Sequence, residues 1–503
     1  MDDHVEVERK YDVGPDAVVP DLPGGAEPVE HDLVATYYDT PDLRLQDARI
    51  TLRRRTGGVD EGWHLKLPGR GDARVEVHAP LGSDTVPAVL LARVRAHVRD
   101  VEVVPVARLS THRSVRPIAE DGVVVAELCD DTVRAEGLPV VAGEGLTTDT
   151  WREWELELVD GDPGLFEALD PALRLAGATP ATRASKVARI LAARLPADGW
   201  RRHATTGVTT AGEVFLAYLV EQLDWLLEQD RAFRAGAVDE PVHQMRVASR
   251  RLRSTLATYR PLLRRGARGT AGSLREELRW LGTSLSEARD ITVLRDRLDT
   301  RLDEDDHPTA AVTRSHVDAV LGAHHRVALD HAAGVLDDPR YFRLLDDLEE
   351  FLAAAPLKSR ADRPARRELP SVLRAEVKRF RRRARRVERA PDEVSQERAL
   401  HDVRKAAKRL RYAAEAATPV FGAEAEELAA RAEAVQEVLG EHQDTVVSRA
   451  ALHDLAHHGK ATGPVGLGLG RLQQLELERA AELRAESAAV IADARRIPRW
   501  LRK

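Results

Sequence analysis

Cysteine, aromatic residues and long apolar runs are all scarce in this chain of 503 residues. The one cysteine, Cys129, excludes a disulfide framework and fits a reducing compartment. Every apolar run is shorter than the roughly 18 residues that indicate a membrane span, and the N-terminus MDDHVEVERK is too polar for a secretory signal. We therefore expect a cytoplasmic protein with no membrane partner. An aromatic content of 4% also disfavours surfaces that bind bases by stacking.

Charge, by contrast, is plentiful, with 32% charged residues and a net charge of −7. Basic segments alternate with acidic ones such as RLDEDDHP, so the net charge does not set the sign of the field over any one groove. A chain of this length is expected to fold as two or three domains.

The hydrophobic period changes along the chain. Segments up to about residue 160, such as VEVERKYDV and REWELELVDGD, alternate with period two as strands do, with a helix expected at TVPAVLLARVRAHV. From Gly212 onward, Ala, Leu, Arg and Glu recur with helical period between breaks such as RPLLRRGARGTAG and HHGKATGPVGLG. The sequence therefore predicts an α+β chain, with a β-rich domain at 1–196, a linker at 197–211 and an all-helical domain at 212–503.

Charged side chains recur on one face of the predicted strands. Glu6, Glu8 and Lys10 share a face because they are two residues apart. On one strand such a row is normally the solvated side of a sheet, but its recurrence favours strands that close into a barrel around a charged interior. The other members of the pattern are Arg53, Arg55, Lys66, Arg74, Glu76, Glu153, Glu155 and Glu157.

A buried interior that holds both signs of charge is costly unless a ligand occupies it. Carboxylates suit Mg²⁺ or Mn²⁺, which prefer oxygen ligands and often bridge to phosphate. Arginine suits phosphate because its guanidinium donates two parallel hydrogen bonds. The combination predicts a polyphosphorylated substrate and a divalent metal cofactor.

These residues resemble a known family. VEVERK fits the E-x-E-x-K signature of CYTH domains, the triphosphate tunnel metalloenzymes, and the segments TLRRR, HLKLP, RVEVHAP, THRSVR, VAELCDD, REWELELVDGD and SKVARIL follow in the family's order over residues 3–193. The resemblance implies an antiparallel β-barrel tunnel that binds triphosphate and hydrolyses it with Mg²⁺ or Mn²⁺. Similar domains include thiamine triphosphatases and adenylate cyclases, but the low aromatic content favours inorganic triphosphate or short polyphosphate over a ligand with an organic head group.

The resemblance also implies a role for each matching residue. Metal would be held by Glu6, Glu8, Glu153 and Glu155, and the reaction would depend most on Glu6, Glu8, Lys10 and Lys66. Phosphate oxygens would be bound by Lys10, Arg53, Arg55, Lys66, Arg74, Arg113 and Lys186. Supporting roles would go to Glu76, Glu127, Asp130 and Glu157.

The helical half contains a duplication. VHQMRVASRRLRSTLATY from Val242 and LHDVRKAAKRLRYAAEAA from Leu400 carry the same ladder of basic residues, and LSEARDITV (285–293) resembles LGEHQDTVV (439–447). On a helix, each ladder forms one stripe on one face. The stripes are His243, Arg246, Arg250 and Arg253, and His401, Arg404, Lys408 and Arg411, with Lys405 beside the second. The segment 213–234 has its counterpart at 371–390, which holds nine Arg or Lys and only two Glu.

Two like-charged stripes brought together by a duplicated fold cost energy unless an anion lies between them. The duplicated histidine-bearing basic helix resembles the CHAD domain, a frequent companion of CYTH domains, over residues 205–500. The resemblance implies two helical bundles and a basic surface that binds inorganic polyphosphate. Its polyphosphate-binding residues would be His243, Arg246, Arg250, Arg253, Lys378, Arg382, His401, Arg404, Lys405, Lys408 and Arg411.

Other interpretations remain open at this point. The chain can be a triphosphatase with a polyphosphate-docking module, or a non-catalytic polyphosphate-binding protein that targets polyphosphate granules. Nucleic acid is a weaker candidate partner because the basic helices lack interleaved aromatics. His243 and His401 each lack a second ligand one turn away, which favours contact with phosphate over metal binding.

Overall fold

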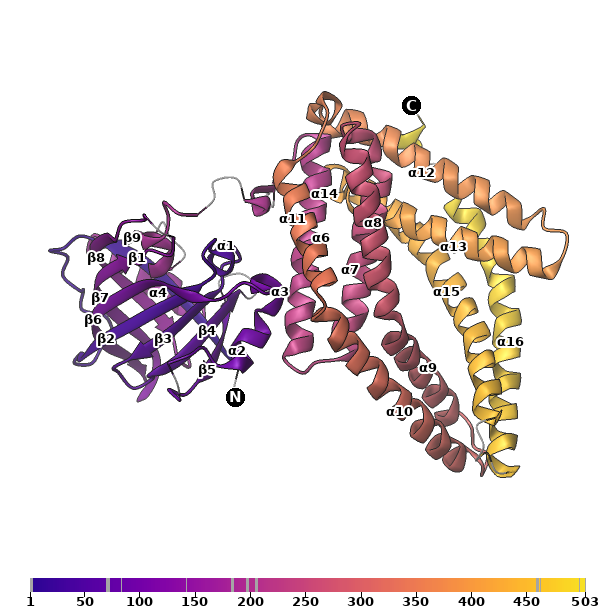
Figure 1. Ribbon diagram of the computed structural model, residues 1–503, viewed down its shortest axis with the longest axis horizontal. Helices are drawn as coiled ribbons and strands as arrows, with labels where there is room; N and C mark the ends of the chain where they lie inside the picture. Colours follow the sequence, from indigo (N-terminus) through magenta and orange to yellow (C-terminus); the bar gives the residue numbers. More distant parts are fainter. Residues whose placement is uncertain are drawn as a thin grey trace. The chain divides into compact units, whose positions relative to one another are not determined.

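The computed structural model describes residues 3–68, 73–82, 84–141, 143–181, 185–195, 199–203, 207–457, 461, 463–496 and 498–502, without the side chains of residues 3–6, 73, 202 and 499. The chain divides into two compact units, Met1–Ala197 and Asp198–Lys503 (Figure 1). Each unit is described by itself.

The first unit is a closed antiparallel β-barrel. Its strand order is β5-β4-β3-β2-β6-β7-β8-β1-β9, and an additional pairing of β5 with β1 closes the sheet. The predicted barrel is confirmed by this closure. The strands are β1 (Asp3–Val13), β2 (Val29–Asp39), β3 (Thr51–Thr56), β4 (Gly62–Pro68), β5 (Ala73–Ala79), β6 (Val104–Glu120), β7 (Val123–Gly137), β8 (Thr147–Leu158) and β9 (Thr179–Pro180).

Much of the apolar packing of this unit lies outside the barrel. On β8, Trp154 and Leu156 are fully buried against α4 (Gly164–Leu175), an amphipathic helix that contributes Phe166 and Leu173. A second outer cluster packs β3, β4 and β5 against α1 (Arg44–Asp47), α2 (Ala88–Arg93) and α3 (Arg95–Val98), the last two arising in the segment where a helix was predicted. Side chains alternate along a strand. The apolar residues that pack under the helices therefore face outward, and the charged residues between them face the interior of the barrel.

Apolar side chains fill one end of the interior. Leu109, Val133 and Trp151 pack there against Val187 of α5 (Lys186–Ile190). Ser185 caps this short helix by accepting a hydrogen bond from the Ala188 amide at 3.2 Å, as expected for an N-cap serine. The helix thereby fixes the backbone of Lys186 at the wall of the interior.

The second unit is all-helical and repeats one arrangement. The helix α6 packs on α7, α12 packs on α13, and α7 packs on α13, so the duplicated segments lie in equivalent positions. The helices are α6 (Ala211–Arg234), α7 (Asp239–Thr258), α8 (Ala267–Ser284), α9 (Ser286–Asp303), α10 (Ala310–Leu336), α11 (Pro339–Ala354), α12 (Ala365–Val387), α13 (Glu393–Glu415), α14 (Thr418–Phe421), α15 (Ala423–His457) and α16 (Gly463–Ala494). The predicted helical domain of two related bundles is confirmed. In the part of the chain that the structure describes, none of these helices is long and apolar enough to cross a membrane.

One predicted break is wrong in part. The segment HHGKATGPVGLG was expected to be a loop, but α16 already begins at Gly463. Gly468 serves packing there, because a Cβ at this position would collide with the side chain of Thr313 on α10. Close helix–helix contact therefore outweighs the low helix propensity of glycine at this site.

Candidate functional site

The barrel encloses a cavity of about 120 Å³ whose wall is mostly charged. Seven basic and five acidic side chains line it. The predicted tunnel residues among them are Glu8, Lys10, Arg53, Arg55, Lys66, Arg74, Glu76, Arg113, Glu155, Glu157 and Lys186. Side chains from six strands and from α5 therefore meet in one interior, although they come from opposite ends of the unit's sequence.

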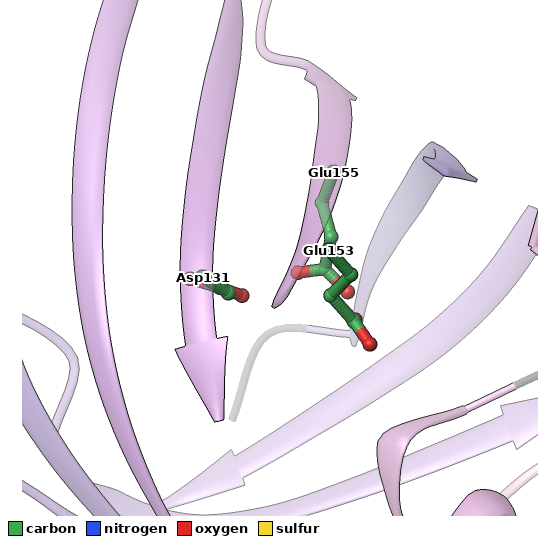
Figure 2. A group of neighbouring side chains, drawn as sticks. All are labelled: Asp131, Glu153 and Glu155. Carbon is green, nitrogen blue, oxygen red and sulfur yellow. The ribbon is translucent and has the colours of Figure 1, made fainter. Parts of the chain in front are cut away.

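A cluster of three buried carboxylates stands beside this cavity. Asp131 of β7 and Glu153 and Glu155 of β8 point toward one another from neighbouring strands (Figure 2). One oxygen from each side chain lies within 4.8 Å of the other two. Three oxygen donors at this spacing fit a divalent cation such as Mg²⁺ or Mn²⁺.

Asp131 was missed by the sequence analysis, which named its neighbour Asp130. The structure corrects that choice: Asp130 accepts two hydrogen bonds from Arg152, at 2.6 and 2.8 Å, whose guanidinium also donates to the carbonyl groups of Pro15 and Ala17. Adjacent residues of a strand face opposite ways, so Asp130 faces outward and Asp131 inward. The sequence DD offers no signal that decides between the two.

Lys186 supplies a positive charge at the centre of the carboxylate cluster. Its Nζ lies 2.9 Å from Asp131 Oδ2, 2.8 Å from Glu153 Oε1 and 2.7 Å from Glu155 Oε1. The three carboxylates thus already surround one cationic group of this chain, which supports their fit to a metal cation. Glu153 is held further by Trp151, whose Nε1 donates to Oε2 at 2.5 Å.

Two more cations hold the same carboxylates. Arg113 donates to both oxygens of Asp131, at 2.8 and 2.6 Å, and to Glu155 Oε2 at 2.5 Å, while Lys10 contacts Glu155 and lies 2.9 Å from Glu8. Burial by itself would raise the pKa of Glu155, but Lys10, Lys186 and Arg113 outweigh it and hold that pKa well below its usual range. The pKa of Asp131 is lowered in the same way by Lys186 and Arg113 against the effect of burial. Asp131 and Glu155 therefore stay ionised at neutral pH and available to a metal.

A second group of charges forms another part of the wall. Glu76 lies 2.9 Å from His64 Nδ1 and within 3.9 Å of both Arg53 and Lys66. Burial opposes its ionisation, yet His64, Lys66 and Arg53 lower the pKa of Glu76 well below its usual range. Glu76 thus orients the basic residues. His64 was not singled out from the sequence, since one histidine on a strand gives no distinctive pattern.

The structure places the remaining predicted tunnel residues in different ways. The backbone of Glu6 pairs with that of Arg74 in the barrel, but its side chain lies outside the described residues. Glu127 pairs with Glu157 across β7 and β8 and shares the inward face of Asp131 by alternation. Arg55, on the cavity wall, contacts Asp60, which the sequence analysis did not name.

Cys129 lies on β7 with only 1% of its surface exposed. Burial raises the pKa of its thiol to about 12, and a thiol in that state is a poor nucleophile. We expect Ellman's reagent at pH 8 to label less than about one tenth of the native protein over the time in which unfolded protein is labelled fully. Complete labelling of the native protein at the unfolded rate would contradict the buried position.

In the helical unit, the two basic ladders meet where α7 packs against α13. Arg250 of α7 reaches across and donates from Nε to Tyr412 Oη of α13 at 2.7 Å. Burial, together with Arg250, Arg404 and Arg246, lowers the pKa of Lys408 to about 6. Burial and neighbouring arginines, Arg289 foremost, lower the pKa of His243 to about 4. We call His243, Arg246, Arg250, His401, Arg404 and Lys408 the central cluster.

The duplication extends to the acidic and small residues that face this cluster. Arg246 lies 3.0 Å from Asp290 and donates to the Ser286 carbonyl at 2.9 Å. At the equivalent place Arg404 lies over Gly440, where a Cβ would come 3.0 Å from its Nη2. The equivalent aspartate, Asp444, partly offsets the lowered pKa of Lys408. The sequence repeat therefore corresponds to a repeat of side-chain positions.

Some predicted members of the stripes lie differently. Arg411 is neutralised by Glu415 at 2.6 Å and Glu433 at 2.7 Å, so it is a weaker candidate for an anion contact. Arg253 has Arg279 and Arg275 as charged neighbours, and with burial they lower its pKa. Lys405 is exposed on α13. Lys378 and Arg382 line a separate groove on α12, together with residues 501–502.

Comparison with known proteins gives matches in both units. The CYTH domain family matches residues 4–191 and the CHAD domain family matches residues 217–453. An uncharacterised protein of Mycobacterium tuberculosis (strain CDC 1551 / Oshkosh) is 38% identical over 523 aligned positions, which cover 99% of this chain and 98% of the relative. This chain belongs to the CYTH–CHAD family.

Other similarities cover a smaller share of this CYTH–CHAD protein. A thiamine-triphosphatase of Macaca fascicularis is 46% identical over 69 residues, which are 13% of this chain and 27% of the relative. The crystal structure of the CHAD domain from the plant Ricinus communis matches with 29% identity and a TM-score of 0.46, covering 57% of this chain and 93% of that one. The long CYTH–CHAD relative thus shares both units, whereas the thiamine-triphosphatase shares one segment.

Proposed function

We propose that residues 1–196 of this CYTH–CHAD protein hydrolyse inorganic triphosphate, or short polyphosphate, with Mg²⁺ or Mn²⁺, and that residues 212–503 bind inorganic polyphosphate. The observation that carries the first part is a cavity inside the barrel in which seven basic side chains adjoin three clustered carboxylates. The basic residues would bind the phosphate oxygens through charge-assisted hydrogen bonds. The carboxylates would hold the metal, with Glu8 and Glu6 of β1 as further donors.

The proposed reaction is the transfer of a terminal phosphoryl group to water. A bond forms between the water oxygen and the terminal phosphorus, the bridging P–O bond breaks, and pyrophosphate and phosphate leave. A bound divalent metal would neutralise phosphate charge and lower the pKa of a water ligand. Lys10, Arg113 and Lys186 would stabilise the negative charge of the phosphoryl group and its leaving group, which is the main demand of phosphoryl transfer.

The wall of the cavity favours a substrate without an organic head group. Tyr37 is the one aromatic residue among the described residues that line it. Trp63 and Trp154 are fully buried in the outer apolar clusters, and Trp151 packs at the apolar end of the interior. A thiazolium or adenine ring would lack the stacking surface that is worth about 1–3 kcal/mol per base.

A substrate panel tests this part of the proposal. The full chain with Mg²⁺ or Mn²⁺ should release phosphate from triphosphate about 10-fold or more faster than from ATP or thiamine triphosphate, at equal low substrate concentration, because no ring is stacked. Glu155→Gln should abolish the release from all three. If thiamine triphosphate is hydrolysed as fast as triphosphate, the proposed substrate is wrong. If the Glu155→Gln variant is as active as the wild-type protein, the proposed site is wrong.

A non-catalytic binding role is the second candidate, and one observation favours it. The carboxylates Asp131, Glu153 and Glu155 are all ion-paired with cations of this chain, so the barrel could hold a polyanion without metal. Binding of triphosphate without phosphate release, in the presence of each divalent metal, would support this role. Release that depends on metal would support the enzyme.

The central cluster carries the second part of the proposal. Lys408, Arg250 and Arg404 crowd together at the α7–α13 contact. Burial, and after it the repulsion from neighbouring cations, lowers the pKa values of Lys408 and Arg404. A polyanion would relieve that repulsion. Inorganic polyphosphate offers a charge on every unit, and its binding would weaken steeply with salt, as with nucleic acid backbones.

A further inference from the structure

A large groove lies beside α12, apart from the central cluster. It has a volume of about 740 Å³ and is lined by α12 together with Leu501 and Arg502. The central cluster is instead formed by α7 and α13, and α13 packs against both α7 and α12. The two sites are therefore distinct surfaces of the same helical unit.

One wall of this groove is a stripe of basic side chains. It consists of Arg374, Lys378, Arg381, Arg382 and Arg385. Four of these five side chains are exposed, Arg381 being the half-buried one. At a rise of about 1.5 Å per residue, the stripe is about 16 Å long.

The stripe lacks the carboxylate partners that other cations of α12 have. Arg379 pairs with Glu376 at 3.1 Å, and Arg383 pairs with Asp402. Among the described residues, none forms an ion pair with the five members of the stripe. Like charges three and four residues apart on a helix destabilise it, so the stripe has a cost that folding does not recover.

The equivalent helix in the other half of the unit shows that the fold does not require this charge. The helix α6 packs on α7 as α12 packs on α13, yet it carries Glu221, Asp224, Glu228 and Asp230 in its corresponding stretch. The two related helices therefore differ in charge over this stretch, because α6 has no Arg or Lys between Glu213 and Asp230. A function specific to α12 explains the difference.

The shape of the site selects the kind of polyanion. A hollow of about 740 Å³ that runs along one basic helix fits a flexible linear polyanion, whereas a membrane surface needs a flat or convex basic face with exposed apolar residues. Duplex DNA is normally read by an element placed in its groove, whereas this site is a hollow between α12 and residues 501–502. A flexible chain of phosphates meets the length and the charge of the stripe.

We propose that this groove is a second polyphosphate-binding site and that a long polyphosphate chain occupies it and the central cluster at the same time. The inference rests on the proposed polyphosphate binding of the helical half. Joining two sites on one chain makes the second contact intramolecular, and the gain in affinity can reach two or more orders of magnitude. Long chains would therefore bind much more tightly than short ones.

Calorimetric titration of the full chain tests the proposal with three variants. The groove variant replaces Arg374, Lys378 and Arg382 by Gln. The control variant replaces Arg367, Arg386 and Arg389 by Gln, which removes the same charge from the same segment but outside the groove lining. The central variant carries Lys408→Met and Arg404→Gln.

Short-chain polyphosphate, titrated without divalent metal, should bind the groove and central variants with a stoichiometry one lower than that of the wild-type and control proteins, since the barrel contributes equally to all four. Long-chain polyphosphate should bind the groove variant on the order of 100-fold more weakly than the control variant. Equal stoichiometry and equal long-chain affinity in these two variants would overturn the second site while leaving the proposed function intact.

Two further outcomes would also decide the matter. Absence of polyphosphate binding by the wild-type protein would overturn both the second site and the proposed function of the helical half. The central variant also allows a competition assay, in which duplex DNA or phosphatidylglycerol vesicles compete with bound polyphosphate. If either competitor displaces it at a lower phosphate concentration than unlabelled polyphosphate does, the groove would be assigned to that competitor instead.

Discussion

Asp131→Asn should reduce metal-dependent phosphate release from triphosphate by at least about 100-fold, the usual loss when one preorganised charge of an active site is removed. The change keeps the shape of the side chain but takes one anionic oxygen from the cluster with Glu153 and Glu155. Asp130→Asn is the matched control, because Asp130 faces outward and pairs with Arg152. That control should keep its activity within about twofold, as is typical of surface changes.

Stability must be measured with activity in this comparison. Asp131 is fully buried and partners Arg113 and Lys186, and breaking a buried ion pair costs about 3–5 kcal/mol. Titration of Mn²⁺ into folded protein supplies a second readout, in which Asp131→Asn and Glu153→Gln should both weaken binding and Asp130→Asn should not. Activity and Mn²⁺ affinity unchanged in a folded Asp131→Asn protein would exclude this residue from the metal site.

Polyphosphate binding should weaken by about tenfold for each pH unit above about pH 6, through the protonation of Lys408. Burial and the neighbouring Arg250 and Arg404 lower the pKa of Lys408 to about 6 in the free protein, whereas a bound polyanion favours the charged form and raises it. Between these two pKa values the complex therefore holds one more proton than the free protein. Binding takes up that proton, so affinity falls as pH rises, to about 50-fold weaker at pH 8 than at pH 6.

The same pKa shift determines how the stability of the ligand-free protein changes with pH. The folded-state pKa of Lys408 is depressed below that of the unfolded chain, so near neutral pH the unfolded state binds more protons. The free energy of unfolding should thus rise with pH above about 6, and Lys408→Met should stabilise the ligand-free protein by roughly 1 kcal/mol or more by removing a buried charge. Binding and stability therefore depend on this lysine with opposite signs.

Fluorescence anisotropy of long-chain polyphosphate, at constant ionic strength from pH 6 to pH 9, measures this pH dependence. Long chains are used because they have few terminal phosphates that titrate in this range. Lys408→Met should bind more weakly and with a smaller pH slope. Lys405→Met, on the exposed face of α13, should lose affinity but keep the slope. His243 and His401, whose pKa values are also lowered, would extend the slope below pH 6. A wild-type slope of zero above pH 6 would refute the role given to Lys408.

The sequence predicts the architecture because the relevant signals are periodic. Charges two residues apart, as at Arg53 and Arg55, mark one face of a strand, and the ladder from His243 to Arg253 marks one face of a helix. These patterns depend only on local geometry. The barrel, the helical unit and most of the charged residues that line the cavity were accessible for that reason. Arg113 and Lys186 were named only through the resemblance to CYTH domains, and Asp60 was missed.

The rest of the site depends on contacts that no local pattern encodes. The choice between Asp130 and Asp131 rests on the pairing register of β7 with β8, which a pair of adjacent aspartates does not reveal. The neutralisation of Arg411 rests on Glu433, from a different helix. The separation of Lys378 and Arg382 from the central cluster rests on how α12 packs against α13. Each of these three features follows from the tertiary structure and is absent from any local sequence pattern.

The position of Lys186 has a consequence for how the protein is produced. Since its ammonium group balances Asp131, Glu153 and Glu155, the barrel carries its own counter-charge, and we expect it to fold without an added divalent ion. It differs in this from small zinc domains, which stay unfolded until metal arrives. Divalent ion supply would then govern how fast the protein works, but not how much of it accumulates in the cell.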